Sequence, residues 1–153
     1  MNKWVKLIVS ILICQIAGVI GSIFTAPSIT SWYADLQKPA FSPPNWVFGP
    51  VWITLYTLMG ISLYLVWNKK KNVKIPLTLF FTQLILNSVW SIIFFGLQNP
   101  FYALLEIIIL WVTILLTIIS FYKVSKKASF LLLPYILWVT IATFLNYYIW
   151  ILN

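Results

Sequence analysis

Long apolar runs alternate with short polar segments along this chain. Five such runs, each 22 to 24 residues long, lie at 5–26, 46–67, 75–97, 101–122 and 129–152. About 20 apolar residues cross the ~30 Å hydrocarbon core of a bilayer as a helix. The runs lack the alternation of barrel strands, and backbone in lipid must satisfy its own hydrogen bonds. The pattern therefore predicts an all-α membrane protein, a single domain built as a five-transmembrane-helix bundle, with a long loop at 27–45.

Composition agrees with this pattern. Hydrophobic residues make up 62% of the 153 residues and charged residues 8%, and the mean hydropathy is +0.98. No soluble domain of this size has an interior that could bury so much apolar surface. The first run begins beside Lys3 and Lys6, as that of a signal peptide would, but it is too long and "FTAP" is a poor cleavage site. We interpret it as an uncleaved first helix.

The net charge of +8 is distributed unevenly. Nine of the ten lysines precede the first predicted helix or lie between the second and third or the fourth and fifth, and only Lys38 lies in the other loops. Lysine-rich loops stay on the cytoplasmic side. We therefore expect an integral protein of the bacterial cytoplasmic membrane with its N-terminus in the cytoplasm. The lysines are expected to meet anionic lipid, and no nucleic-acid partner is expected.

The sequence excludes several kinds of chemistry. Cys14 is the only cysteine, and the chain has no histidine, so a disulfide within the chain, a His/Cys zinc site and a Ser-His-Asp triad are all ruled out. The only acidic residues are Asp35 and Glu106, too few for a hard-cation cage, and no metal site is expected. An intramembrane carboxylate is a functional candidate, but for Glu106 we favour a structural hydrogen bond.

Polar and aromatic residues form stripes within three of the predicted helices. They are spaced three or four apart, so each set shares one helix face: Trp52, Tyr56 and Met59; Gln83, Asn87 and Trp90; Tyr135, Trp138, Ala142 and Asn146. Such stripes indicate either an interior that meets a ligand or interhelical hydrogen bonds between amides, and spacing alone leaves both open. The first helix instead carries small residues that let a second backbone approach, either within the chain or from another subunit: Ala17, Gly18, Gly21 and Ser22.

The segment "WYADLQKPAFSPPNWVFGPVW" at 32–52 is rich in rigid and aromatic residues. Prolines lower the entropy that a loop loses on ordering, and aromatic side chains can pack on helix ends. We interpret 27–45 as a folded lid over the outer end of the bundle. An aromatic belt at the membrane interface is the alternative.

Together with "LYTLMG", "QLILNSVWSIIFFG" and "LLLPYILWVTIATFLNYYIW", this segment resembles the translocator protein/tryptophan-rich sensory protein (TspO/MBR) family, from about residue 18 to the C-terminus. The resemblance implies a five-helix membrane protein, commonly a homodimer. Family members bind protoporphyrin IX, haem, sterols and benzodiazepine-type ligands in a pocket covered by the loop between the first two helices. Some bacterial members degrade protoporphyrin in light.

Residue by residue, the resemblance implies a set of ligand contacts in this chain. They are Tyr33, Pro43, Pro44, Trp52, Asn87, Trp90, Trp138, Ala142 and Leu145, and the stripe on the second helix adds Tyr56. Trp52 and Trp138 match the tryptophans tied to photochemistry and are the catalytic candidates. Lys38 could meet a propionate. Sterol binding is not carried over, because the tail "LNYYIWILN" lacks the basic residue of the sterol motif.

The expected function is that of a membrane sensor or regulator that binds a tetrapyrrole, with light-dependent porphyrin degradation. No cofactor is required, and porphyrin or haem is the ligand. The alternatives are a transporter of porphyrins or other amphipathic molecules and a partner-binding membrane module. A transporter is less favoured, since the interior lacks the paired ionisable groups of coupled pumps.

Overall fold

A computed structural model describes residues 1–153 and contains helices and no strands. The elements are α1 (Lys3–Ile29), the 3₁₀ turn η1 (Tyr33–Asp35), α2 (Asn45–Trp67), α3 (Lys74–Ser91), the π-helical turn η2 (Ile92–Gly96), α4 (Pro100–Tyr122), α5 (Lys126–Leu131) and α6 (Leu133–Leu152). Taking α3 with η2 and α5 with α6, five helices are long and apolar enough to cross a membrane. The all-α, five-span fold predicted from the sequence is confirmed.

Local sequence sets where the helices begin. The Asn99 side chain accepts a hydrogen bond from the Tyr102 N–H, and Pro100 occupies the first turn of α4, where a missing N–H is harmless. Ser125 caps α5 in the same way through the Ala128 N–H. These side chains satisfy N–H groups that have no partner within the helix.

Two prolines shift the predicted boundaries. α1 continues through Pro27 to Ile29, so the loop comprises residues 30–44 and not 27–45. The fifth span begins at Lys126, three residues before the predicted 129, and is broken after Leu131, with Pro134 in the first turn of α6. The fifth span is therefore two helices and not one continuous helix, because Pro134 has no N–H to continue the hydrogen-bond ladder of α5.

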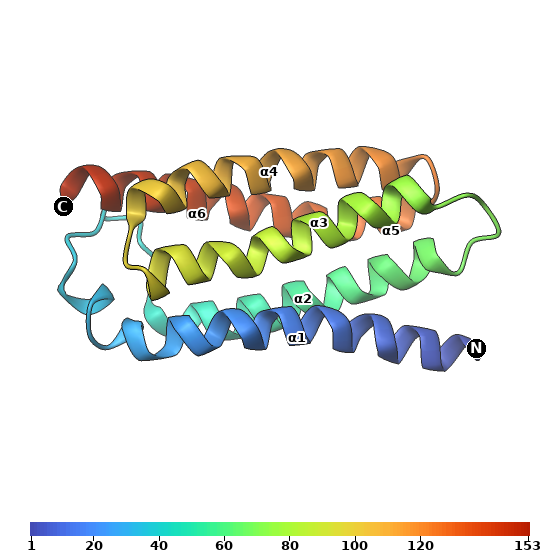
Figure 1. The fold of residues 1–153 in the computed structure, drawn as a ribbon, viewed down its shortest axis with the longest axis horizontal. Helices are drawn as coiled ribbons and strands as arrows, with labels where there is room; N and C mark the ends of the chain where they lie inside the picture. The colour runs from blue at the N-terminus through green and yellow to red at the C-terminus, as the bar shows by residue number, and fades with distance from the viewer.

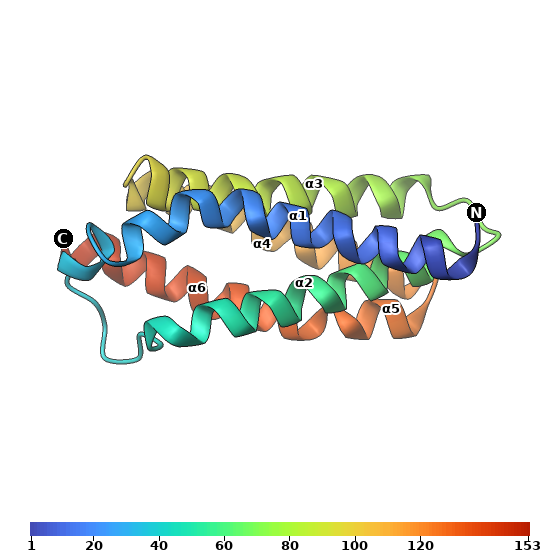
Figure 2. The ribbon, with the colours of Figure 1, turned by 90° about the horizontal axis from the view of Figure 1, so that it is seen from below.

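The helices run side by side along one long axis (Figures 1 and 2) and surround a common interior. α1 packs between α2 and α3, α4 packs between α3 and α6, and α5 closes the ring against α2. The N-terminus and the connections α2–α3 and α4–α5 lie at one end, which we call the lysine end, while the 30–44 loop and the C-terminus lie at the other, the loop end (Figure 1).

We expect the lysine end to face the cytoplasm, because nine of the ten lysines gather there. Single cysteines at position 70 and at position 37, each in a Cys14→Ser background, should be labelled by an impermeant thiol reagent from opposite sides of the membrane. Labelling of position 37 from the cytoplasmic side would overturn this orientation.

Candidate functional site

A cavity of about 350 Å³ lies inside the ring in its loop-end half. Every spanning helix except α4 contributes to its wall, together with Tyr33 from the loop. No charged residue lines it. The lining is dominated by aromatic side chains, namely Tyr33, Phe48, Trp52, Tyr56, Trp90, Phe94, Phe95 and Trp138. A cavity of this size and polarity is typical of sites for largely apolar ligands.

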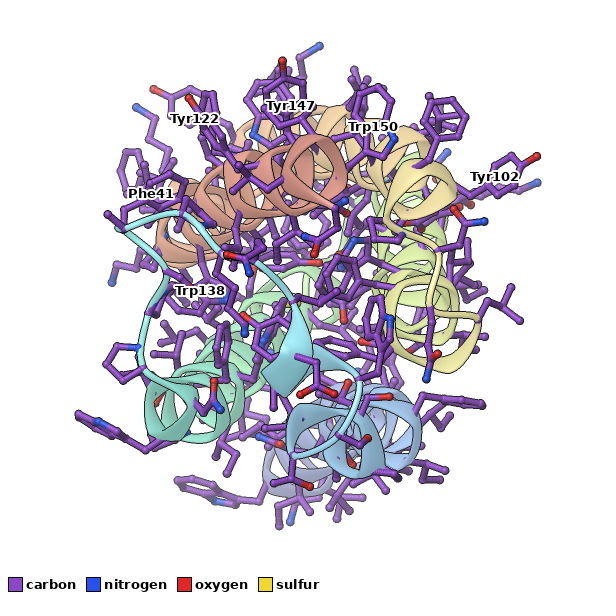
Figure 3. The ribbon with its side chains drawn as sticks, turned by 90° about the vertical axis from the view of Figure 1, so that its left-hand side faces the viewer. Phe41, Tyr102, Tyr122, Trp138, Tyr147 and Trp150 are labelled. Atoms are coloured by element: carbon purple, nitrogen blue, oxygen red, sulfur yellow. The ribbon has the colours of Figure 1, made fainter.

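Trp52 and Trp138 are half-buried in this wall. The Trp52 ring stacks on Tyr56 at a centroid distance of 5.4 Å, and Trp138 meets Phe48 edge-on at 5.9 Å. Seen from the loop end, Trp138 lies inside the ring of helices, whereas Trp150 points outward (Figure 3). The indole N–H groups of Trp90 and Trp111 are hydrogen-bonded within the protein, whereas those of Trp52 and Trp138 are not and are free to bond to a ligand.

Trp90 is held in place by Asn146. The Trp90 Nε1 donates to Asn146 Oδ1 at 3.0 Å, and Asn146 Nδ2 donates to the Pro100 carbonyl at 2.7 Å, which ties α3, α4 and α6 together. Trp90 also stacks on Phe94 at 5.0 Å. Asn146 also lines the cavity, although from the sequence it was assigned only to a polar stripe and was not predicted as a ligand contact. Ala142 and Leu145, predicted on the same helix, line the cavity as well.

Asn87 is not in the cavity wall. Its Oδ1 accepts from the Tyr56 hydroxyl, and its Nδ2 donates to the Tyr135 hydroxyl at 2.8 Å. The Tyr135 hydroxyl in turn donates to Gln83 Oε1 at 2.7 Å. Asn87 therefore lies behind Tyr56 in a buried network that joins α2, α3 and α6. Of the two interpretations of the amide stripe, interhelical hydrogen bonding describes Gln83 and Asn87.

The 30–44 loop closes the loop end of the cavity. Tyr33 is 2% exposed and packs edge-on against Phe48 at 6.5 Å and tilted against Phe95 at 5.7 Å. Its buried hydroxyl has no hydrogen-bond partner, and burial raises the pKa of the Tyr33 phenol above its ordinary value. The phenol is thus a neutral donor at physiological pH. Trp32 packs beside it on Phe94 at 5.5 Å.

Three loop residues do not take the positions expected of ligand contacts. Pro43 and Pro44 lie outside the cavity wall, and Pro44 is the residue before the first turn of α2. The Lys38 ammonium lies 4.6 Å from the centroid of the Tyr33 ring and donates to the Leu36 carbonyl at 3.2 Å. Lys38 therefore stabilises the loop itself.

The predicted hydrogen bond of Glu106 is absent. Glu106 is buried in α4, and both of its carboxylate oxygens lack a hydrogen-bond partner within the protein. Glu106 therefore differs from the other buried polar residues of the bundle interior, such as Gln83 and Asn146, whose side chains are hydrogen-bonded.

The small-residue face of α1 also forms part of the site. Gly18 lies against the Tyr56 ring, Gly21 lies against Ser91, and the Ala17 carbonyl accepts from Ser88 Oγ at 2.9 Å. The close partners are thus α2 and α3 of the same chain. No α1 residue was predicted from the sequence as a ligand contact, although the small residues of this helix could have indicated such contacts. The α1 residues that line the cavity include Gln15, Gly18, Val19, Gly21, Ser22 and Thr25.

The sequence of this chain is similar to those of several known proteins. A sequence profile of the TspO/MBR family matches residues 10–151. The chain is 51% identical to the tryptophan-rich protein TspO of Archaeoglobus fulgidus over 97% of both chains, and 39% identical to the human translocator protein over 96% of this chain and 89% of that one. It is 34% identical to the tryptophan-rich sensory protein of Cereibacter sphaeroides over 76% and 73% of the two chains. The chain therefore belongs to the TspO/MBR family of integral membrane proteins.

Proposed function

We propose that this protein is a membrane sensor or regulator that binds a tetrapyrrole in the cavity at the loop end. The observation that carries the proposal is the uncharged aromatic wall with two free indole N–H groups, on Trp52 and Trp138. A porphyrin is a flat π-system, and each favourable ring pair adds about 0.5–1.5 kcal/mol beyond the burial of apolar area. The name of the Cereibacter relative, a sensory protein, favours a sensor.

Metal-free protoporphyrin IX is the ligand that this wall suits best. Haem iron is held by His, Cys, Met or Tyr side chains. No His, Cys or Met lines the cavity, the Tyr56 hydroxyl donates to Asn87, and burial keeps the Tyr33 phenol neutral. The macrocycle can instead be held through its two faces by indole and phenol rings. Binding to the purified protein in nanodiscs, followed by quenching of tryptophan fluorescence, is the direct test. No saturable quenching at micromolar porphyrin would overturn the proposal.

Trp138→Phe should weaken protoporphyrin IX binding about three- to tenfold. Phenylalanine keeps most of the apolar contact but loses the larger ring face and the indole N–H, which is a loss of about 1 kcal/mol. Trp150→Phe is the matched control, because Trp150 lies on the same helix and faces away from the cavity (Figure 3). Equal affinities for the two variants would place the porphyrin outside the cavity.

Light-dependent loss of porphyrin should depend on the same two tryptophans. A photoexcited porphyrin can take an electron from a nearby indole, whereas phenylalanine is a poor donor. We expect the Trp52→Phe/Trp138→Phe double variant, saturated with protoporphyrin IX and illuminated in the presence of dioxygen, to lose pigment at least about tenfold more slowly than wild type.

The control for this photochemistry is a Trp46→Phe/Trp150→Phe double variant, whose two tryptophans are exposed outside the cavity. An unchanged rate in the cavity double variant would remove the indoles from the reaction. Net porphyrin flux in proteoliposomes without pigment loss would instead indicate a transporter.

A further inference from the structure

The 30–44 loop is held over the loop end of the cavity by several contacts. Tyr33 lines the cavity and is buried, as described above. Further along the loop, the Gln37 N–H donates to Asn153 Oδ1 at 3.0 Å, and Asn153 Nδ2 donates back to the Gln37 carbonyl at 3.0 Å. Phe41 packs edge-on against Tyr148 of α6 at 5.6 Å. The loop is thus fastened to α6, and it crosses the end of the ring (Figure 3).

The side of the cavity between α1 and α2 is different. Four residues there line the cavity and are also exposed on the outer surface of the helices: Val19, Ser22, Gly49 and Ile53. Val19 is 59% exposed and Ile53 62% exposed. A Cβ atom added at Gly49 would meet no atom within 4 Å. These four residues therefore frame an opening, which we call the side window.

The lysine-end edge of the side window is fixed by Gln15. Its Nε2 donates to the Ile53 carbonyl at 3.1 Å and to Thr57 Oγ1 at 3.0 Å, so it bridges α1 and α2. Beyond Gln15 the two helices are in direct contact, since a Cβ at Gly60 would fall 2.5 Å from the Ile11 Cα. The opening consequently does not extend past Gln15.

The side window lies at a defined depth in the bilayer. Gln15 is close to the middle of α1, and Gly49 is four residues, or about 6 Å, from the start of α2. The opening thus runs from near the bilayer centre to headgroup depth at the loop end. A flat ligand lying in that leaflet can present its apolar body to the window while a charged edge stays among the headgroups.

We infer that the cavity takes its ligand sideways from the lipid leaflet at the loop end, through the side window between α1 and α2, while the 30–44 loop stays closed. The ligand class follows from the route: a flat, lipid-partitioned molecule that is uncharged over the part held in the cavity and polar at one edge. This inference rests on the proposed function for the identity of the ligand, but the route is a property of the protein alone.

The kinetic test compares an obstructed window with a fastened loop. Val19→Trp narrows the window, and Ile23→Trp, one turn away on α1, is its control, because Ile23 is 62% exposed and outside the cavity wall. In a third variant, Gln37→Cys and Asn153→Cys in a Cys14→Ser background are bridged by a short bifunctional thiol reagent. Association and dissociation rates of protoporphyrin IX are measured in nanodiscs by stopped flow.

Val19→Trp should lower both the association and the dissociation rate about tenfold, because an obstructed route slows passage in both directions. Ile23→Trp and the bridged loop should leave both rates within about twofold of wild type. A bridged loop that abolishes binding, with normal rates for Val19→Trp, would assign the route to the loop end and overturn the inference. No equilibrium binding by wild type would instead reject the proposed ligand.

A second readout tests the route without porphyrin. Ala142→Cys in a Cys14→Ser background places a thiol in the cavity wall. A lipid-soluble maleimide should label it at least about tenfold faster than a membrane-impermeant sulfonated maleimide, and Val19→Trp should slow the lipid-soluble reagent. Faster labelling by the impermeant reagent, unaffected by Val19→Trp, would show access from water and overturn the side window.

Discussion

Gly60→Val is expected to destabilise the helix bundle by about 3 kcal/mol. Gly60 is buried in α2, and a Cβ there would lie 2.5 Å from the Cα and 2.9 Å from the N of Ile11. Both are backbone atoms of α1, so no rotamer change can relieve the overlap, and the two helices must move apart. Overpacking of a tight core typically costs about 1–3 kcal/mol, and a clash between two backbones falls at the upper end.

Gly49→Val is the matched control on the same helix. Its Cβ would meet nothing within 4 Å, so its effect should stay within about 0.5 kcal/mol. Reversible unfolding in mixed micelles, followed by far-UV circular dichroism, gives both values. Equal stabilities for the two variants would show that the close approach of α1 and α2 at Gly60 does not stabilise the bundle.

The spans could be predicted from the sequence because length and apolar character alone decide whether a segment crosses a bilayer. The residues at which the spans begin and end were harder to predict. Pro27 was assigned to the loop, but it lies in the last turn of α1, which ends two residues later at Ile29. The predicted fifth run gave no sign that its first turns form a separate short helix, α5, whose start is capped by Ser125 and which ends before Pro134. Both outcomes depend on local backbone conformation, which a hydropathy pattern does not contain.

The residues of the candidate site could be predicted only in part from the sequence, and the reason is geometric. Asn87 and Trp90 are three residues apart, so they share a face in any periodicity argument, yet their side chains differ by about 60° around the helix. That rotation turns Trp90 toward the cavity and Asn87 toward Tyr56 and Tyr135. Sequence spacing can place residues on one side of a helix, but it cannot say which neighbour each one meets.

The partners that the loop residues contact could not be predicted from the sequence. Aromatic content suggested that the loop packs, and the structure places Tyr33 on Phe48 and Phe41 on Tyr148. The partners lie on α2 and α6, and the reciprocal bonds between Gln37 and Asn153 join positions 116 residues apart. No local pattern encodes such a pairing, because it exists only once the ring of helices has brought both segments to the same end.

Asn87→Leu is expected to destabilise the bundle by about 2–4 kcal/mol while leaving protoporphyrin IX binding within about twofold of wild type. The substitution keeps the volume but leaves the Tyr56 hydroxyl without its acceptor and removes the donor to the Tyr135 hydroxyl. Each buried polar group left unpaired costs about 1–3 kcal/mol. Binding should persist, because Asn87 is separated from the cavity by the Tyr56 ring.

A double-mutant cycle separates this network from a general packing defect. Tyr56→Phe removes the donor that Asn87→Leu leaves unpaired, so the double variant should be more stable than the sum of the two single losses predicts, by about 1 kcal/mol. Strict additivity would mean that the hydroxyl and the amide do not stabilise one another. The opposite pattern, in which Asn87→Leu keeps wild-type stability and abolishes porphyrin binding, would return Asn87 to the ligand site, because only a direct contact could then explain the loss.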